Sequence, residues 1–303
     1  MTTIIPFAAG EENLDWLALT DALAAGHTLP KAEISDSFLY RGKDTLLQRQ
    51  AWIDGLGIGV KSATVFPDNP AQEVPMIHGA VTLFDDAHGR LEALLDFHLV
   101  TKWKTAGDSL LAARRLARPD SRNILIVGAG TVGRNLHAAY SAAFPNAQFT
   151  VWNRTAANAE KMAAQIPGLK IALDLPAAVA AADIITCATM STEPTLLGEW
   201  LRPGQHVDLI GAYRPDMREA DDVALQRARI FVDSFETTLD HIGELKRPLA
   251  SGVISRNDVL ADYYALDAFK RQSDDEITLF KNGGGAHLDL MTSRYILDQW
   301  TGA

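Results

Sequence analysis

The most constraining feature of this chain is a glycine-rich turn between a short apolar run and an Ala-rich stretch. Gly128, Gly130 and Gly133 have G-x-G-x-x-G spacing in the segment NILIVGAGTVGRN, directly after the apolar residues 124–127. In this context the first glycine permits a tight turn, the second lets the backbone approach a pyrophosphate, and the third allows close packing of helix on strand. The segment therefore predicts a dinucleotide site with its phosphates at a helix N-terminus.

The sequence around this turn has the alternation of strand-like and helix-like segments that is typical of an α/β domain. From about residue 121, short β-rich runs alternate with Ala-rich stretches such as 131–144 and 155–166, a pattern typical of crossover helices on a parallel sheet. Six strands are predicted, at residues 123–127, 149–152, 170–172, 183–188, 206–210 and 230–233. Six strands make a complete Rossmann sheet, so we predict a Rossmann NAD(P)-binding domain over residues 119–285.

The first 118 residues predict a different, α+β domain. A helix at 14–25 is followed by a strand-rich region with several turn signals and then by a long helix at 99–117. Arginines near the end of that helix and Pro119 just beyond it favour termination there. A final amphipathic helix, 288–300, lies outside the six-strand count, so residues 286–303 are expected to return to the first domain.

Composition excludes several classes of function. The 28 Lys and Arg against 38 Asp and Glu give a net charge of −10, which argues against a nucleic-acid partner. The most apolar window, 171–190, is interrupted by Asp and Pro, so no membrane span is predicted. The single cysteine, Cys187, excludes an internal disulfide and suits a reducing, cytoplasmic compartment. The histidines and acids show no metal-ligand spacing, and no metal is expected.

The residues after the second predicted strand bear on the choice of dinucleotide. An NAD-specific site usually carries an acid about 20 residues beyond the glycine motif, where it binds the ribose 2′-hydroxyl. Here Asn153, Arg154 and Thr155 follow the strand. A guanidinium pairs bidentately with a phosphate, so NADP(H) is favoured, with NAD(H) as the alternative. The expected cofactor contacts also include Thr131, Val132 and Thr189.

Three further segments resemble the ornithine cyclodeaminase/mu-crystallin family. They are LGIGVKSATVFPDNP at 56–70, VTKWKTAGDSLLAARRLA at 100–117 and DLIGAYRPDMREAD at 208–221. The resemblance runs over most of the chain from about residue 46. It implies that the first domain binds substrate and forms a homodimer. Members of the family reduce imines of α-keto acids, oxidise amino acids or cyclise ornithine with loss of ammonia, and some only bind NADP(H) and a small ligand.

The resemblance also assigns residues to the substrate. Lys61 in GVKS matches the family lysine that contacts the substrate carboxylate beside the reacting centre. Where the family has a carboxylate-clamping arginine, this chain has Lys104, which binds as a point charge rather than as a planar fork. The family's Met-Pro step is replaced by Arg49-Gln50. Both Arg49 and Arg41 are candidates to supply the missing guanidinium.

Two other positions concern proton transfer. Tyr213 stands where cyclodeaminases have an aspartate after the Gly-Ala pair. A phenol is a poor general base at neutral pH but a serviceable hydrogen-bond donor, and a wall residue without a chemical role is an equal alternative. Asp289 matches an acid of the family segment that approaches the nicotinamide. His287 is new to that pattern, which leaves the proton donor open.

The leading hypothesis is an NAD(P)H-dependent reductase of a small α-imino acid, such as Δ1-pyrroline-2-carboxylate, with amino-acid oxidation as the reverse reaction. Its substrate would bind at the carboxyl ends of the Rossmann strands, with Lys61 and Lys104 on the carboxylate. Two alternatives remain. One is a cyclodeaminase-type lyase that uses NAD without net redox change, and the other is a non-catalytic protein that binds NADP and a small ligand.

Overall fold

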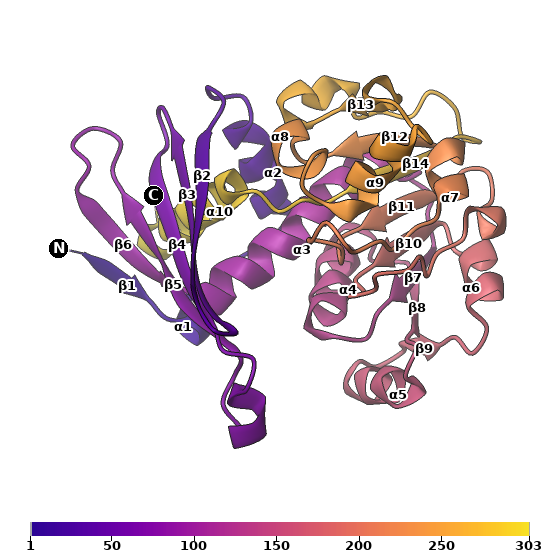
Figure 1. Cartoon of the computed structure of the whole chain (residues 1–303), viewed down its shortest axis with the longest axis horizontal. Coiled ribbons are helices and arrows are strands. Elements are labelled where there is room, and N and C mark those ends of the chain that lie inside the picture. The colour runs from indigo at the N-terminus through magenta and orange to yellow at the C-terminus, as the bar shows by residue number, and fades with distance from the viewer. Residues whose placement is uncertain (1, 303) are drawn as a thin grey trace. The chain divides into compact units, whose positions relative to one another are not determined.

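The computed structural model describes residues 2–302, which divide into two compact units (Figure 1). The first unit runs to residue 104 and resumes at 284, and the second spans 105–283. The boundary lies inside helix α3 (Phe97–Leu116), whereas the sequence predicts one at 118–119. The helix runs without a break across the division between the units, so the sequence has no turn signal there. The signals that it does have mark the end of the helix, which lies about a dozen residues later.

A six-stranded sheet forms the first unit, in the order β1-β6-β5-β4-β3-β2. Its strands are β1 (Thr3–Ile5), β2 (Glu33–Arg41), β3 (Asp44–Ile53), β4 (Gly57–Val65), β5 (Ile77–Phe84) and β6 (Leu91–Asp96). All neighbours are antiparallel except β1 and β6. Gly42, between β2 and β3, and Gly55, between β3 and β4, have φ of 60° and 85°, values that favour glycine in tight hairpins.

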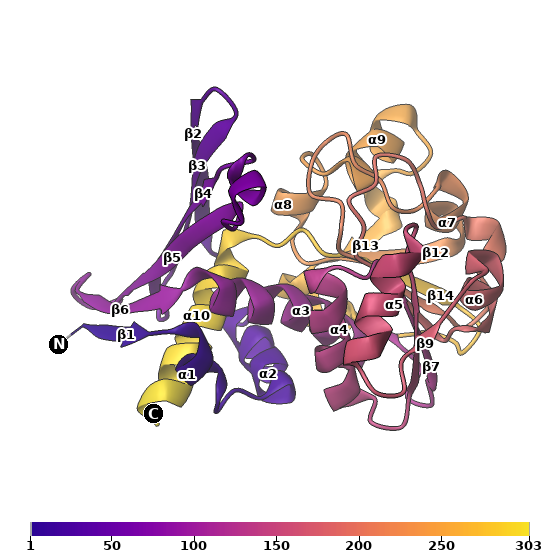
Figure 2. The same cartoon turned by 90° about the horizontal axis from the view of Figure 1, so that it is seen from below.

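Helix α10 (Ala286–Thr301) completes the first unit. It packs on β3 and β4 and on α2 (Trp16–Gly26), as Figure 2 shows. The short helices α1 (Phe7–Glu11) and η1 (Asn69–Gln72) belong to the same unit. The unit is therefore built from two segments far apart in sequence, with the C-terminal helix returning to an N-terminal sheet. Strand β2 forms one edge of that sheet and is exposed along almost its whole length.

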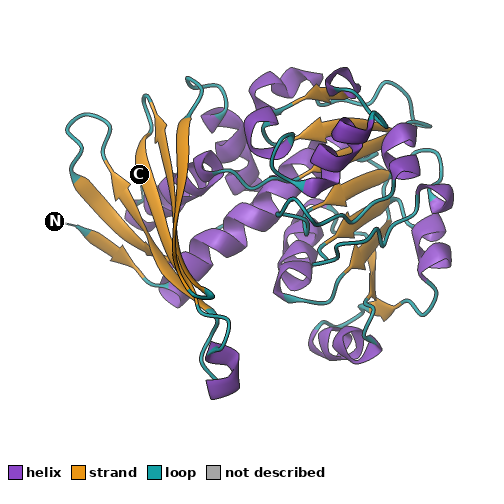
Figure 3. Ribbon diagram, viewed as in Figure 1, coloured by secondary structure: helices purple, strands orange, loops and turns teal. Residues whose placement is uncertain are grey.

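The second unit is an eight-stranded parallel sheet in the order β13-β12-β14-β11-β10-β7-β8-β9, with helices on both faces (Figure 3). Its strands are β7 (Asn123–Val127), β8 (Gln148–Trp152), β9 (Lys170–Ile171), β10 (Ile184–Cys187), β11 (His206–Leu209), β12 (Ala228–Val232), β13 (Val259–Ala261) and β14 (Ile277–Lys281). Its helices after α3 are α4 (Thr131–Ala143), α5 (Ala156–Gln165), α6 (Leu175–Ala181), η2 (Gly198–Trp200), α7 (Asp222–Arg227), α8 (Phe235–Thr238), α9 (Gly243–Ser251), η3 (Arg256–Asp258) and η4 (Tyr263–Ala268).

This architecture confirms the prediction of a Rossmann fold, but the strand count of six is wrong. The six predicted strands omit β13 and β14, and β14 inserts between β11 and β12. The prediction stops at six because six strands already make a complete Rossmann sheet, and these two strands, of three and five residues, lie beyond that count in the sequence.

A buried carboxylate ties the helices of the second unit to its sheet. Asp208 on β11 accepts hydrogen bonds from Ser109 on α3 at 2.9 Å, Thr186 on β10 at 2.7 Å and Tyr140 on α4 at 3.1 Å. Burial raises the pKa of Asp208 to about 6, although the three hydroxyl donors oppose that shift. Because a buried carboxylate needs such partners, these bonds fix the position of α3 and α4 on the sheet.

Candidate active site

The glycine turn has the close contacts that its sequence predicts. Strand β7 leads into Gly128, whose φ is 119°, and α4 begins after its N-cap, Gly130. A Cβ on Gly128 would lie 2.6 Å from the Ala188 carbonyl oxygen, and one on Gly133 would lie 2.1 Å from that of Gly128. At Gly130 a Cβ would meet nothing within 4 Å. Two of the glycines are thus required by packing, and the third leaves open space beside the helix N-terminus.

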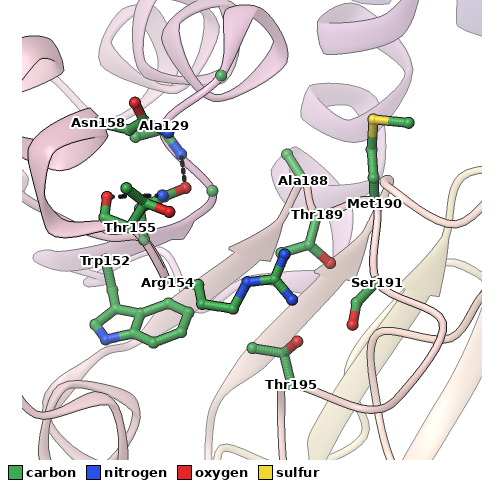
Figure 4. Close-up of a pocket in the computed structure, with 13 residues that line it drawn as sticks. Ala129, Trp152, Arg154, Thr155, Asn158, Ala188, Thr189, Met190, Ser191 and Thr195 are labelled. Atoms are coloured by element: carbon green, nitrogen blue, oxygen red, sulfur yellow. Dashed lines mark hydrogen bonds between the residues drawn. The ribbon is translucent and has the colours of Figure 1, made fainter.

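A pocket of about 310 Å³ lies beside this turn (Figure 4), a volume within the range of ligand sites. Three segments line it: Gly128, Ala129 and Gly130; Trp152, Asn153, Arg154, Thr155 and Asn158; and Ala188, Thr189, Met190, Ser191 and Thr195. None of these lining residues is acidic. Of the predicted cofactor contacts, Thr131 and Val132 form the start of α4, and neither they nor Gly133 line the pocket.

Asn153 and Arg154 differ in how firmly they are held. The Asn153 side chain accepts a hydrogen bond from the Ala129 N–H at 3.0 Å and donates one to the Thr155 carbonyl at 2.9 Å. It therefore fastens the glycine turn to the end of β8. Arg154 is exposed, and its guanidinium projects into the pocket (Figure 4). The pocket thus presents a cation at the place where an NAD-specific site presents an acid.

The first unit brings three predicted residues together. Lys61 on β4 donates to Asp289 on α10 at 2.9 Å and to Thr101 on α3 at 2.8 Å. The Nζ atom of Lys104, also on α3, lies 3.8 Å from the same Asp289 oxygen. All three charged side chains are buried. The other carboxylate oxygen of Asp289 has no hydrogen-bond partner among residues 2–302.

Arg49, and not Arg41, joins this cluster. Arg49 on β3 lies directly opposite Lys61 in the sheet, so the two side chains share one face. Its guanidinium donates to the Gly284 carbonyl at 2.7 Å, and Lys104 donates to the same oxygen at 3.0 Å. Arg41, by contrast, pairs with Asp44 at the hairpin and its side chain is 79% exposed. The guanidinium beside the two lysines therefore comes from Arg49.

Burial and charge set the protonation of this cluster. Burial lowers the pKa of Lys61 to about 8, the Asp289 carboxylate opposing the shift and the positive charge of Lys104 adding to it. Burial opposes ionisation of Asp289 too, but Lys104, Lys61 and Arg49 outweigh it and hold the pKa of that carboxyl below its usual value. Burial and then Lys104 lower the pKa of His287 to about 3, so its ring is neutral and is a poor proton donor.

Tyr213 lies in the second unit, in the loop after β11. Its side chain is 56% exposed, and the Arg214 guanidinium lies 5.7 Å from the centre of its ring. Arg214 is itself paired with Asp216 at 3.0 Å, and both side chains of that pair are exposed. Arg214 also interacts with the Tyr213 hydroxyl, so the polar partner of the phenol comes from its own loop.

The sequence prediction omits two residues that the structure places at these features, Thr101 in the cationic cluster and Glu219 beside the glycine-turn pocket. Thr101 lies three residues before Lys104, and this i, i+3 spacing places both on one face of α3, a signal that was available in the sequence. Glu219 is fully buried and accepts hydrogen bonds from the loops that follow β10 and β11. Its surroundings in the sequence, DMREAD, are typical of a solvated segment and give no such signal.

Among residues 2–302, no helix is long and apolar enough to cross a membrane. Nor does this part of the chain bring three or more His, Cys, Asp or Glu side chains together as a metal site would require.

Known proteins resemble the chain over nearly its full length. The Δ1-pyrroline-2-carboxylate reductase of Paracoccus denitrificans is 53% identical over 291 residues, which cover 93% of this chain and 92% of that protein. The structure of Thermococcus litoralis Δ1-pyrroline-2-carboxylate reductase in complex with NADH and L-proline matches with a TM-score of 0.90 at 24% identity, over 99% of this chain and 98% of that one.

An archaeal alanine dehydrogenase dimer with bound NAD matches with a TM-score of 0.89 at 25% identity, covering 99% of this chain and 96% of that one. Residues 53–303 match the family described as ornithine cyclodeaminase/mu-crystallin. That range contains the glycine turn, both lysines and Asp289. The chain belongs to the ornithine cyclodeaminase/mu-crystallin family.

Proposed function

We propose that the protein is an NAD(P)H-dependent reductase of a cyclic α-imino acid, such as Δ1-pyrroline-2-carboxylate, which it converts to the amino acid, with oxidation as the reverse reaction. The observation that carries this proposal is the buried cluster of Lys61, Lys104 and Asp289, in a chain that also has a dinucleotide turn. The 53% identity to a Δ1-pyrroline-2-carboxylate reductase supports the substrate class.

The dinucleotide fits the glycine-turn pocket. The open space at Gly130 and the unpaired N–H groups at the start of α4 suit a pyrophosphate, and a side chain at position 130 would occupy that space. When bound, a reduced nicotinamide supplies the hydride for a C=N carbon. The chain's own residues then have three tasks: to hold the substrate carboxylate, to orient the C=N bond and to deliver a proton to its nitrogen.

The carboxylate of the substrate is assigned to the cationic cluster. Arg49, Lys61 and Lys104 face Asp289, and Asp36 is the second carboxylate in contact, through Arg49. Three cations against two carboxylates leave one positive charge, which suits a monocarboxylate. A guanidinium can bind a carboxylate through two parallel hydrogen bonds, which the Lys104 ammonium cannot do. We therefore assign this bidentate contact to Arg49 on β3 rather than to a residue of α3.

Lys61 is the proposed proton donor to the imine nitrogen. With its pKa lowered to about 8, the ammonium is present at neutral pH yet releases its proton more readily than an ordinary lysine. We expect kcat/KM for reduction to fall as pH rises through about 8, because Lys61 loses its proton there. The measurement is a pH profile from 6 to 10 with NADPH and the cyclic imine.

The control for this profile is Lys61→Arg, which keeps the positive charge but holds its proton throughout that range. Titration of the free imine affects every variant equally, so the Lys61 contribution is the difference between the two profiles. An inflection near pH 8 that is unchanged in Lys61→Arg would contradict the assignment.

We propose NADPH as the preferred reductant because Arg154 projects into a pocket with no acidic lining residue. Arg154→Ala is expected to raise KM for NADPH about tenfold or more and KM for NADH by less than about twofold, since only NADPH carries the 2′-phosphate. Initial rates with both cofactors measure this. Arg256→Ala serves as control, because Arg256 is exposed and pairs with Asp240 away from the pocket. Equal effects on both cofactors, or preference of the wild type for NADH, would defeat the proposal.

The experiment that tests the function as a whole is a substrate panel of cyclic and acyclic imino acids and amino acids, assayed in both directions with NADPH and NADH. Reduction of a cyclic imine with stoichiometric oxidation of the cofactor is the expected result. Dinucleotide binding without turnover of any member would instead favour a binding protein. Release of ammonia from ornithine without net cofactor oxidation would favour a lyase.

A homodimer formed through the edge of the first sheet is also proposed. Phe38 and Tyr40 alternate with Leu39 on β2, and all three are exposed, Tyr40 to 72%. An open edge strand with exposed apolar side chains requires a cover, and the archaeal alanine dehydrogenase that this chain resembles is described as a dimer. We expect Phe38→Asp with Tyr40→Asp to yield monomers in sedimentation velocity.

Leu173→Asp is the control for that experiment, because Leu173 is even more exposed but lies in the second unit. Its variant is expected to keep the mass of the wild type. A wild-type chain that sediments as a monomer, or a double variant that stays dimeric, would exclude this interface.

Cytoplasmic location is the final element of the proposal. It is supported by the single cysteine of the sequence, Cys187, which is buried in β10 as a free thiol. A chain without disulfides is suited to a reducing compartment. The dinucleotide chemistry proposed above also uses soluble cofactors of that compartment.

A further inference from the structure

Glu219 bridges two loops at the carboxyl end of the Rossmann sheet. One carboxylate oxygen accepts hydrogen bonds from the Thr189 N–H at 2.7 Å and the Thr189 hydroxyl at 2.8 Å. The other accepts from the Gly211 N–H at 2.6 Å and the Ala212 N–H at 3.3 Å. Thr189 follows β10, and Gly211 and Ala212 follow β11. The side chain is fully buried, so the four donors are directed at one water-excluded carboxylate.

The two loops carry different parts of the proposed site. The loop after β10 lines the glycine-turn pocket from residue 188 to residue 191, and the loop after β11 carries Tyr213. They approach so closely that a Cβ on Gly211 would lie 1.9 Å from the Thr189 carbonyl oxygen. Backbone bonds hold the same region, because the N–H groups of Thr195 and Leu196 both donate to the Glu219 carbonyl at 2.8 Å.

We propose that Glu219 is a positioning residue that fixes the pocket loop against the Tyr213 loop, so that its carboxylate sets dinucleotide affinity without touching the dinucleotide. This inference rests on the proposed function only in assigning the glycine-turn pocket to NAD(P)H. Its basis is the set of four hydrogen bonds, which join the pocket wall to the adjacent strand connection.

The chemistry of the contact requires a carboxylate. Both oxygens of a carboxylate accept, whereas an amide has one accepting oxygen and an NH₂ group that would face an N–H donor. Burial raises the pKa of Glu219 to about 8, and Lys281 and the Thr189 donors oppose that shift while Glu244 adds to it, so the bridge is strongest where the carboxyl is ionised. Glu244 also accepts from the Glu219 N–H at 2.7 Å and so holds the backbone of Glu219.

A matched control is present in the same sheet. Asp208 is an equally buried carboxyl that ties β10 to β11 through Thr186, but it does so within the strands rather than in the loops that follow them. Asp208→Asn therefore removes a buried carboxylate from the same layer and leaves the four loop contacts of Glu219 in place. General destabilisation affects both variants, whereas loss of the loop bridge affects only Glu219→Gln.

The experiment uses the full chain and has two readouts. Amide hydrogen exchange follows the N–H groups of Thr189, Gly211 and Ala212, and NADPH fluorescence gives Kd in the absence of imino acid. In Glu219→Gln we expect faster exchange on the side of the bridge that meets the NH₂ group, either at Thr189 or at Ala212 and Gly211, and a Kd raised about tenfold or more, since the donors on that side lose their side-chain acceptor. In Asp208→Asn we expect exchange at these amides to stay slow and Kd to rise less than in Glu219→Gln, because the amide oxygen still accepts a hydrogen bond and so keeps a contact with α3, α4 or β10.

Several results would overturn the inference. One is faster exchange in Glu219→Gln with an unchanged Kd, which would make the bridge purely structural. Another is an equal rise of Kd in both variants. If Glu219→Gln does not fold, Glu219→Asp keeps the charge but shortens the reach by one methylene, and an unchanged Kd in that variant would also count against the inference. A wild-type chain that binds neither dinucleotide would instead overturn the proposed function, so that measurement comes first.

Discussion

Replacing Lys61 by Met is expected to lower kcat/KM for reduction of the cyclic imine by about 10- to 150-fold, with NADPH affinity nearly unchanged. Loss of a charge-assisted hydrogen bond to substrate in a buried site costs about 1.5–3 kcal/mol, which corresponds to that range. Met has a similar shape and no charge, so the substrate carboxylate loses one of its cations. Steady-state kinetics with the imine, beside a fluorescence titration with NADPH, measures the two effects separately.

Lys104→Met is expected to lose the same carboxylate contact, because Lys104 lies in the same cluster and shares the Gly284 carbonyl with Arg49. Lys61→Met also removes the proposed proton donor, so its loss is expected at the upper end of the range. The control is Lys102→Met on the same helix, since Lys102 pairs with Glu11 and lies outside the cluster. A loss below about threefold would show that the lysine concerned is peripheral. A matching loss in Lys102→Met would point to the helix rather than to the charge.

Ornithine deamination is expected to be at least about 100-fold slower than imine reduction, or absent. Cyclisation of ornithine requires removal of a proton, and the family resemblance implies that cyclodeaminases have an aspartate for this task at the position of Tyr213. A positioned general base contributes about 10²–10⁴-fold, and a phenol that is half exposed supplies little of it. Reduction has no such requirement, because the substrate gains a proton rather than losing one.

The test follows proline and ammonia from ornithine with NAD, in parallel with reduction of the cyclic imine by NADPH. Tyr213→Asp is the informative variant, since it restores a carboxylate at the same loop position, and Tyr213→Phe removes only the hydroxyl. Ornithine turnover by the wild type that equals or exceeds imine reduction would exclude the reductase and favour the lyase.

Local patterns made the Rossmann unit predictable from the sequence. The turn at Gly128 depends on a backbone conformation and a close approach that few residues other than glycine permit, and the adjacent strand and helix have clear periods of their own. The return of the last helix was predicted because residues 288–300 follow the strands assigned to the Rossmann sheet, and the family resemblance implies the same arrangement. The family resemblance, in turn, singled out Lys61, Lys104 and Asp289.

Features that depend on long-range pairing were not predictable. Choosing Arg49 over Arg41 requires the register of β3 against β4, since a shift of one residue would turn the side chain to the other face of the sheet. Glu219 gains its partners only when the loops after β10 and β11 meet, 30 and 8 residues away in the chain. Neither requirement leaves a periodic signal in the sequence.

The place of β14 has a consequence for how the chain is made. This strand, at Ile277–Lys281, lies between β11 and β12 rather than at an edge, and helix α10 packs on the sheet that residues 3–96 form. During synthesis, therefore, the second sheet lacks a central strand and the first sheet lacks its covering helix until residues 277–301 have left the ribosome. A nascent chain that stops before Ile277 exposes the flanks of two central strands in one unit and an uncovered apolar face in the other. Folding of both units thus depends on residues 277–301. Truncations within this segment should yield aggregates rather than a separately folded first unit.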